Sequence, residues 1–138
     1  MDPLRALAEQ LRDEETPISS HVAETEEDPG LGRLAAAGPR GALAPEEYAL
    51  VVESVREGYL LHYDESRLLA GHDPDLGLLA GDYLYALGIE RLAALGDAEA
   101  VGVLAELIGR CAQLHAEGRD AEAPELWRRA AAAVGGAG

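Results

Sequence analysis

The segment 60–67 holds the side chains of this chain that are best placed to do chemistry. It reads Leu60-Leu61-His62-Tyr63-Asp64-Glu65-Ser66-Arg67, so a histidine, two carboxylates and an arginine follow closely on one another. Mg²⁺ prefers carboxylate oxygens in a near-octahedral arrangement. Around His62, Asp64 and Glu65, no second histidine or carboxylate recurs at the i, i+4 spacing of a metal-binding helix. The segment alone therefore predicts no metal site.

A second motif, Leu79-Ala80-Gly81-Asp82-Tyr83-Leu84, follows the first. Together they make the region from Tyr59 to Trp127 similar to the trans-isoprenyl diphosphate synthase (polyprenyl synthetase) family. Members of that family end a helix with two apolar residues followed by His-Asp-Asp-x-x-Asp. Here Leu60, Leu61, His62 and Asp64 match that pattern, whereas Tyr63 and Arg67 stand where the family has aspartates. The resemblance covers about half of the chain.

The resemblance implies a partial or degenerate member of that family. An allylic diphosphate ionises when several Mg²⁺ ions neutralise the departing diphosphate, and two facing aspartate-rich motifs hold these ions in the family. This sequence lacks the second motif. We therefore expect no catalytic residue, no metal site and no cofactor. The candidate remnant of a diphosphate and magnesium site consists of His62, Asp64, Glu65 and Arg67.

Net charge and composition exclude several classes of protein. The formal net charge is -15, which disfavours nucleic acid and anionic membrane surfaces as partners. The single cysteine, Cys111, cannot form an internal disulfide. No apolar stretch reaches the about 18 to 20 residues that a membrane span needs, so we expect a cytoplasmic protein.

Helical periodicity predicts an all-α fold, a small antiparallel bundle formed by residues 44–135. Apolar residues recur at spacings of three and four, and no segment alternates with a period of two. Proline at the first helical position and aspartate N-caps mark the helix starts, and Gly96 marks a turn. The expected helices cover residues 45–63, 74–95, 98–118 and 124–134.

Residues 1–43 have a different character. Residues 1–28 carry nine acidic side chains against Arg5 and Arg12, and such a segment buries too little apolar area to offset its ordering entropy. We expect a flexible acidic segment with a short helix at residues 3–12.

The helix expected at 74–95 is apolar on most sides, which is typical of a central buried helix. Gly77, Gly81 and Gly88 lie near a common stripe, and this stripe predicts the close approach of another backbone, such as a partner's helix. Asp82 lies inside this helix and has two interpretations. It either faces a cavity of the bundle or forms a hydrogen bond with a neighbouring element, and we favour the latter.

Other polar groups also have two interpretations. Four tyrosines are concerned, namely Tyr59, Tyr63, Tyr83 and Tyr85. They either line a cavity for an isoprenoid-like ligand or belong to the core with their hydroxyls at its rim. Cys111 and His115 are one helical turn apart, a pairing that can activate a thiolate. Because no third orienting group accompanies them, we interpret both as packing residues.

These observations lead to three hypotheses. The first is a non-catalytic accessory or regulatory subunit that acts through helix–helix association in a homo- or hetero-oligomer; a catalytic isoprenyl diphosphate synthase is one candidate partner. The alternative is one subunit of a split trans-prenyltransferase that contributes Asp64 to a shared magnesium–diphosphate site. A third is a carrier of an apolar small molecule held among the tyrosines.

Overall fold

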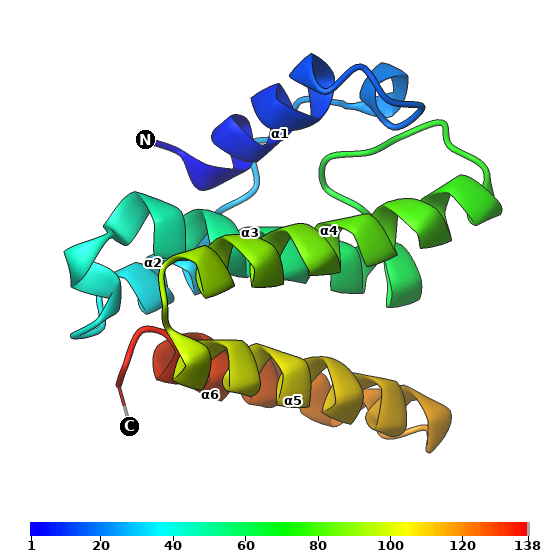
Figure 1. Ribbon diagram of the computed structural model, residues 1–138. Helices are drawn as coiled ribbons and strands as arrows, with labels where there is room; N and C mark the ends of the chain where they lie inside the picture. The colour runs from blue at the N-terminus through cyan, green and yellow to red at the C-terminus, as the bar shows by residue number, and fades with distance from the viewer. Residues whose placement is uncertain (138) are drawn as a thin grey trace.

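The computed structural model describes residues 1–137, which form an all-α fold (Figure 1). Within these residues no strand forms, and the β-structure is limited to an isolated bridge between Val22 and Leu69. The helices of the described chain are α1 (Pro3–Asp13), α2 (Gly30–Ala36), α3 (Pro45–Tyr63), α4 (Pro74–Ala94), α5 (Ala98–Ala116) and α6 (Ala123–Val134). Short 3₁₀ turns lie at Ser19–His21, Gly41–Leu43 and Asp120–Glu122.

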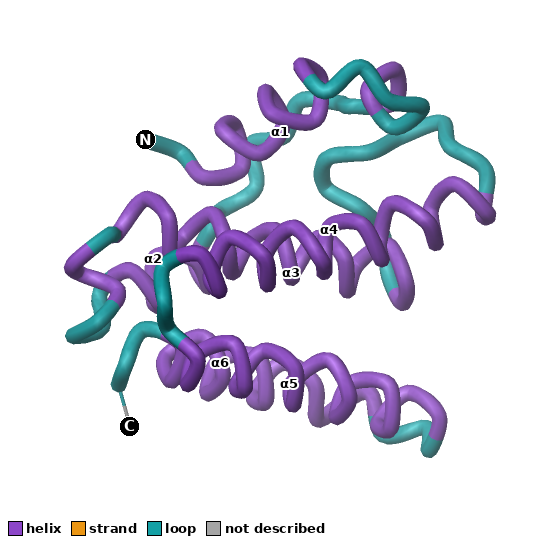
Figure 2. Tube along the Cα trace, in the orientation of Figure 1, coloured by secondary structure: helices purple, strands orange, loops and turns teal. Residues whose placement is uncertain are grey.

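The helix starts follow the local sequence signals. Asp73 caps α4 by accepting a hydrogen bond from the Leu76 N–H at 2.8 Å, and Asp97 caps α5 by accepting one from the Ala100 N–H at 3.0 Å. Between them Gly96 adopts a positive φ of 80°, which favours glycine because it has no Cβ. Short connections join α4 to α5 and α5 to α6, whereas long loops follow α1 and α3, as Figure 2 shows. None of the helices in residues 1–137 is long and apolar enough to cross a lipid bilayer.

The central helix is α3, not α4. It contacts α1, α2, α4 and α5, and its side chains are buried on every side of the helix. The buried positions are Tyr48, Ala49, Leu50, Val51, Val52, Glu53, Ser54, Val55, Glu57, Gly58, Tyr59 and Leu60. The expectation of a central α4 was wrong. The α3 sequence contains polar residues and so looks less apolar than that of α4, but several of these polar residues are buried. One of these, the Ser54 hydroxyl, donates to the Leu84 carbonyl at 2.8 Å.

The glycine stripe of α4 faces α3 of the same chain. A Cβ at Gly88 would lie 2.6 Å from Val55 Cγ2, and one at Gly81 would lie 3.1 Å from the Gly58 carbonyl oxygen. The predicted close approach is therefore confirmed, but its occupant is an internal helix rather than a partner. Gly77 lies outside this contact and faces the His72 ring instead.

The N-terminal segment packs against the helical core, which corrects the expectation of a solvated flexible tail. The short helix expected at residues 3–12 is present as α1. Its apolar face, formed by Leu4, Leu7 and Leu11, is fully buried against Leu68 and Leu84. The segment has enough apolar surface because its leucines share one face while its charges point outward.

The α5–α6 pair forms a separate layer below α3 and α4 in the view of Figure 1. Trp127 of α6 is buried in the main core together with Tyr59 of α3 and Leu107 of α5. At the other end of the pair, the backbone N–H groups of Arg40 and Gly41 donate to the Gly135 carbonyl at 2.8 and 3.1 Å. Both ends of this layer are thus tied to the first half of the chain.

Substitution of Gly88 tests the α3–α4 contact. Gly88→Ala places a methyl group 2.6 Å from Val55 Cγ2 and 3.0 Å from the Val51 carbonyl oxygen. We expect a loss of about 1–3 kcal/mol in the free energy of unfolding, measured by urea denaturation, because overpacked cores distort. The control is Gly102→Ala in α5, where nothing lies within 4 Å of the new Cβ. This control should gain about 0.5–1 kcal/mol, and equal effects of the two variants would contradict the packing.

Candidate functional site

Arg67 is the candidate residue whose surroundings are most informative. It lies in the loop between α3 and α4, and its guanidinium turns inward between two buried glutamates of α3. Its Nε lies 2.9 Å from Glu57 Oε1, and its Nη1 lies 2.7 Å from Glu53 Oε1. Both glutamate side chains are almost completely inaccessible to solvent. The arginine therefore neutralises carboxylates of its own chain.

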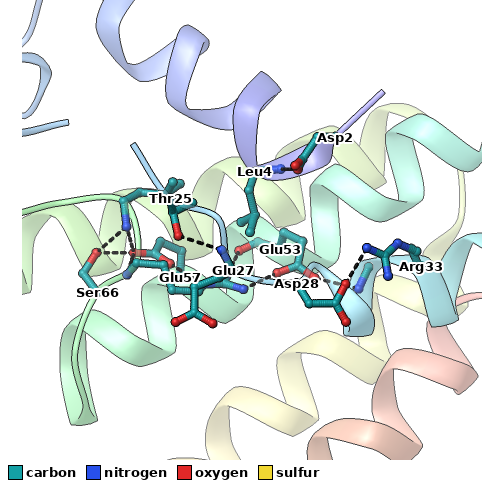
Figure 3. Close-up of polar contacts among 12 residues, drawn as sticks. Asp2, Leu4, Thr25, Glu27, Asp28, Arg33, Glu53, Glu57 and Ser66 are labelled. Atoms are coloured by element: carbon teal, nitrogen blue, oxygen red, sulfur yellow. Dashed lines mark hydrogen bonds and ion pairs between the residues drawn. The ribbon is translucent and has the colours of Figure 1, made fainter. Parts of the chain in front are cut away.

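The two glutamates also bind backbone groups of other elements. Glu57 Oε2 accepts from the Arg67 N–H at 3.0 Å, from the Leu68 N–H at 3.1 Å and from the Ser66 hydroxyl. Glu53 Oε2 accepts from the Gly32 N–H of α2 at 2.7 Å. Figure 3 shows Glu53 and Glu57 next to each other on α3, with Ser66 reaching Glu57 from the loop. The network thus ties both α2 and the α3–α4 loop to the central helix.

Burial and charge act in opposite directions on Arg67. Burial by itself lowers the pKa of its guanidinium, but the charges of Glu53 and Glu57 outweigh burial and raise the pKa above its ordinary value. The two carboxylates thus favour the charged form of the guanidinium. Releasing it to bind an external anion would leave two carboxylates buried without a cation, which is strongly unfavourable.

The other candidate residues take no part in the ion pairs of Arg67. Asp64 is exposed at the end of α3, where its Oδ1 accepts from the Glu65 N–H at 2.9 Å. His62 Nε2 lies 3.0 Å from Asp82 Oδ1 of α4, and its ring stacks on Tyr85 with 5.3 Å between centroids. Within residues 1–137, no three histidine, cysteine or carboxylate side chains converge closely enough to hold a metal ion.

Asp82 has the hydrogen bond to a neighbouring helix that we favoured, but it is not buried. Its side chain is 73% exposed, against 19% for that of His62. Asp82 therefore lies at the surface of α4 and does not face a cavity of the bundle. The bond to His62 links α3 and α4 near the close approach at Gly81.

An open groove of about 440 Å³ runs along the outside of the buried network. Its rim carries Asp64 and Glu65, and Arg56 of α3 contributes a partly buried guanidinium. This guanidinium lies over the Tyr59 and Trp127 rings, 5.1 and 5.0 Å from their centroids. The remaining lining residues are Glu27, Asp28, Gly30, Leu31, Glu53, Leu60 and Arg67.

The tyrosines at the end of α3 pack against other side chains. The Tyr59 hydroxyl lies 2.7 Å from His115 Nε2, and the Tyr63 ring stacks on the same imidazole with 4.1 Å between centroids. Burial raises the pKa of Tyr59 and of Tyr85. Burial also raises the pKa of the Cys111 thiol, which opposes formation of a thiolate. His115 and Cys111 are thus packing residues, as we interpreted them.

Tyr83 connects α4 with the N-terminal segment. Its hydroxyl donates to Glu14 Oε2 at 2.5 Å. Burial and this bonded carboxylate raise the pKa of Tyr83 to about 12. Tyr83 thus has a structural role, because it links α4 to the C-terminal end of α1.

Sequence reasoning missed Glu53 and Glu57. A signal was present, because two acidic residues four positions apart lie on a helix whose other positions are largely apolar. Such a pair shares one helix face, and carboxylates that face a core require a cationic partner. Arg67 is the partner, and only the folded loop reveals that it reaches both.

Comparison of the chain with protein-family models, with curated proteins and with solved structures finds no match. The resemblance to the isoprenyl diphosphate synthases therefore stays a prediction from the two short motifs.

Removal of Arg67 tests the buried network. Arg67→Met leaves the Glu53 and Glu57 carboxylates buried without their cation, so we expect a loss of about 3–5 kcal/mol in the free energy of unfolding. The control is Arg128→Met, which removes an exposed ion pair with Glu125 and should destabilise the chain far less than Arg67→Met does. Urea denaturation measures both. Equal losses in the two variants would show that the network does not stabilise the fold.

The Tyr83–Glu14 contact predicts a loss of stability in alkali. The pKa of Tyr83 rises from 10.0 to about 12 on folding, so its stabilising contribution is complete below pH 10 and disappears as the pH rises toward 12. Tyr83→Phe should therefore show a shallower decline in the free energy of unfolding across this range. Denaturation followed by far-ultraviolet circular dichroism measures the slopes. Identical slopes for wild type and variant would refute the contact.

Proposed function

We propose that this chain is a non-catalytic accessory or regulatory subunit that acts through helix–helix association. The observation that carries the proposal is the uncovered apolar surface of α4. Leu78 and Leu79 are 48% and 66% exposed, although the opposite side of the same helix packs closely on α3. Adjacent large apolar residues left exposed on one helix are typical of a surface that a partner covers.

The arrangement of the charged groups supports a binding role over a catalytic one. Arg67 is held by Glu53 and Glu57, and Asp64 bonds the Glu65 N–H and takes no part in the His62–Asp82 pair. Ionisation of a diphosphate requires several cations held by converging carboxylates. The described residues of this chain do not provide that convergence.

The resemblance of the two motifs to isoprenyl diphosphate synthases suggests which partner to test first. We propose a catalytic member of that family as the associated subunit. The match at residues 60–62 and 79–84 supports this choice.

One observation favours the alternative of a split prenyltransferase. Asp64 and Glu65 border the open groove that also contains Arg56. In this alternative, a partner would bring a second aspartate-rich motif to that groove, and Asp64 would become one ligand of a shared magnesium site.

Prenyl-transfer assays separate these functions. The purified chain, given Mg²⁺ and allylic plus homoallylic diphosphates, should form no product. Mixed with a catalytic isoprenyl diphosphate synthase from the same organism, it should form a complex that size-exclusion chromatography with light scattering detects. Leu79→Ser should weaken that complex, whereas Asp64→Ala should leave both complex and product formation unchanged.

Three results would count against the proposal. Turnover by the chain alone would contradict a non-catalytic role. Loss of product with Asp64→Ala and an intact complex would establish the split enzyme instead. The absence of any complex would remove the isoprenyl synthase as the partner.

A further inference from the structure

The outer face of α4 combines exposed apolar residues with carboxylates. It lies opposite the glycine stripe, and Figure 1 shows α4 in front of α3 with no other element crossing it. The exposed apolar positions of this face are Leu78, Leu79, Ala86 and Ala93, and its exposed charged positions are Asp75, Asp82 and Glu90. The charged positions recur at seven and eight residues along the helix, so they follow the same stripe as the apolar ones.

The arginine of the same helix does not offset these carboxylates. Arg91 turns away from them toward α3, where its Nη2 lies 2.7 Å from Glu47 Oε1. Its Nη1 lies 2.6 Å from Gln10 Oε1 of α1. Asp82 Oδ1 lies 3.0 Å from His62 Nε2 of α3, whereas no ion pair forms at Asp75 or Glu90 within residues 1–137. The outer face of α4 is therefore apolar and acidic.

We infer that this face binds an amphipathic helix of a different protein whose apolar stripe is flanked by lysine and arginine. The inference rests on the proposed function and specifies the partner's chemistry. The exposed leucines provide apolar area at the N-terminal half of α4. The small side chains of Ala86 and Ala93 allow a closer approach at the other half. Basic flanking residues would pair with the carboxylates and raise the rate of association.

A second copy of this chain fits the face poorly. Each copy has a formal net charge of -15, and two α4 faces brought together would oppose carboxylate to carboxylate. Like charges facing each other across an interface disfavour that pairing. Charge complementarity therefore selects a basic partner.

Binding of two synthetic helical peptides tests the inference. Both probes have one leucine and alanine stripe; the first carries lysines on its flanks, and the second carries glutamates at the same positions. Fluorescence anisotropy measures their affinity for the wild-type chain. We expect the lysine peptide to bind, with an affinity that falls as salt rises, and the glutamate peptide not to bind.

Variants locate the binding face. The double variant Leu78→Ser with Leu79→Ser should bind the lysine peptide at least about tenfold more weakly, because it removes the apolar contact. The control is Leu43→Ser, which alters a leucine that is 85% exposed outside α4 and should leave the affinity unchanged. Glu90→Gln combined with Asp75→Asn should reduce the salt dependence. Circular dichroism checks that each variant is folded.

Several outcomes would overturn the inference. They are equal binding of the two peptides, no binding of the lysine peptide, or an affinity that responds to Leu43→Ser but not to the α4 variants. Self-association of the wild-type chain that the α4 double variant abolishes would assign the face to a second copy. Failure of the proposed function is distinguishable from failure of this inference. It appears as prenyl-transfer turnover by the chain alone, which does not depend on the outcome of the peptide-binding measurements.

Discussion

The structure depends on the ion pairs between Arg67 and two buried carboxylates of α3. Glu53 and Glu57 are almost completely buried, and one guanidinium forms an ion pair with each of them. Buried charges persist only when they are paired and hydrogen-bonded. Because the cation comes from the α3–α4 loop and Gly32 of α2 donates to Glu53, the same interaction positions the loop and α2 on the central helix.

This constraint bears on the proposed binding role, because it fixes what Arg67 can contact. Arg67, which the predicted resemblance aligns with a family aspartate, is held within the fold by Glu53 and Glu57. The carboxylates near it either share that arginine or lie apart at the surface, as Asp64 does. The proposed association rests instead on the outer face of α4, where Leu78 and Leu79 are exposed. The buried ion pairs thus hold the helices in place, and the exposed apolar residues of α4 support the proposed association.

The sequence predicts the local structure well and the packing less well. Caps such as Asp73 and Asp97 act within one helical turn, so their residue types indicate the helix starts directly. The centrality of α3 could not be predicted in this way. Its two glutamates lower its apparent hydrophobicity, and their partner Arg67 becomes visible only when the loop folds back. The glycine stripe correctly predicted a close approach, but sequence alone does not say which helix fills it.

The most direct test of the account is an NMR measurement of the Arg67 side chain in isotopically labelled protein. The Nε–H group donates to the buried Glu57 carboxylate at 2.9 Å, and the Arg67 side chain is 12% exposed. The account predicts slow exchange of this proton with solvent and an unchanged signal when Mg²⁺ and inorganic diphosphate are added. Rapid exchange, or a shift of the signal on adding these ions, would show that Arg67 is free to bind external anions and would contradict the account.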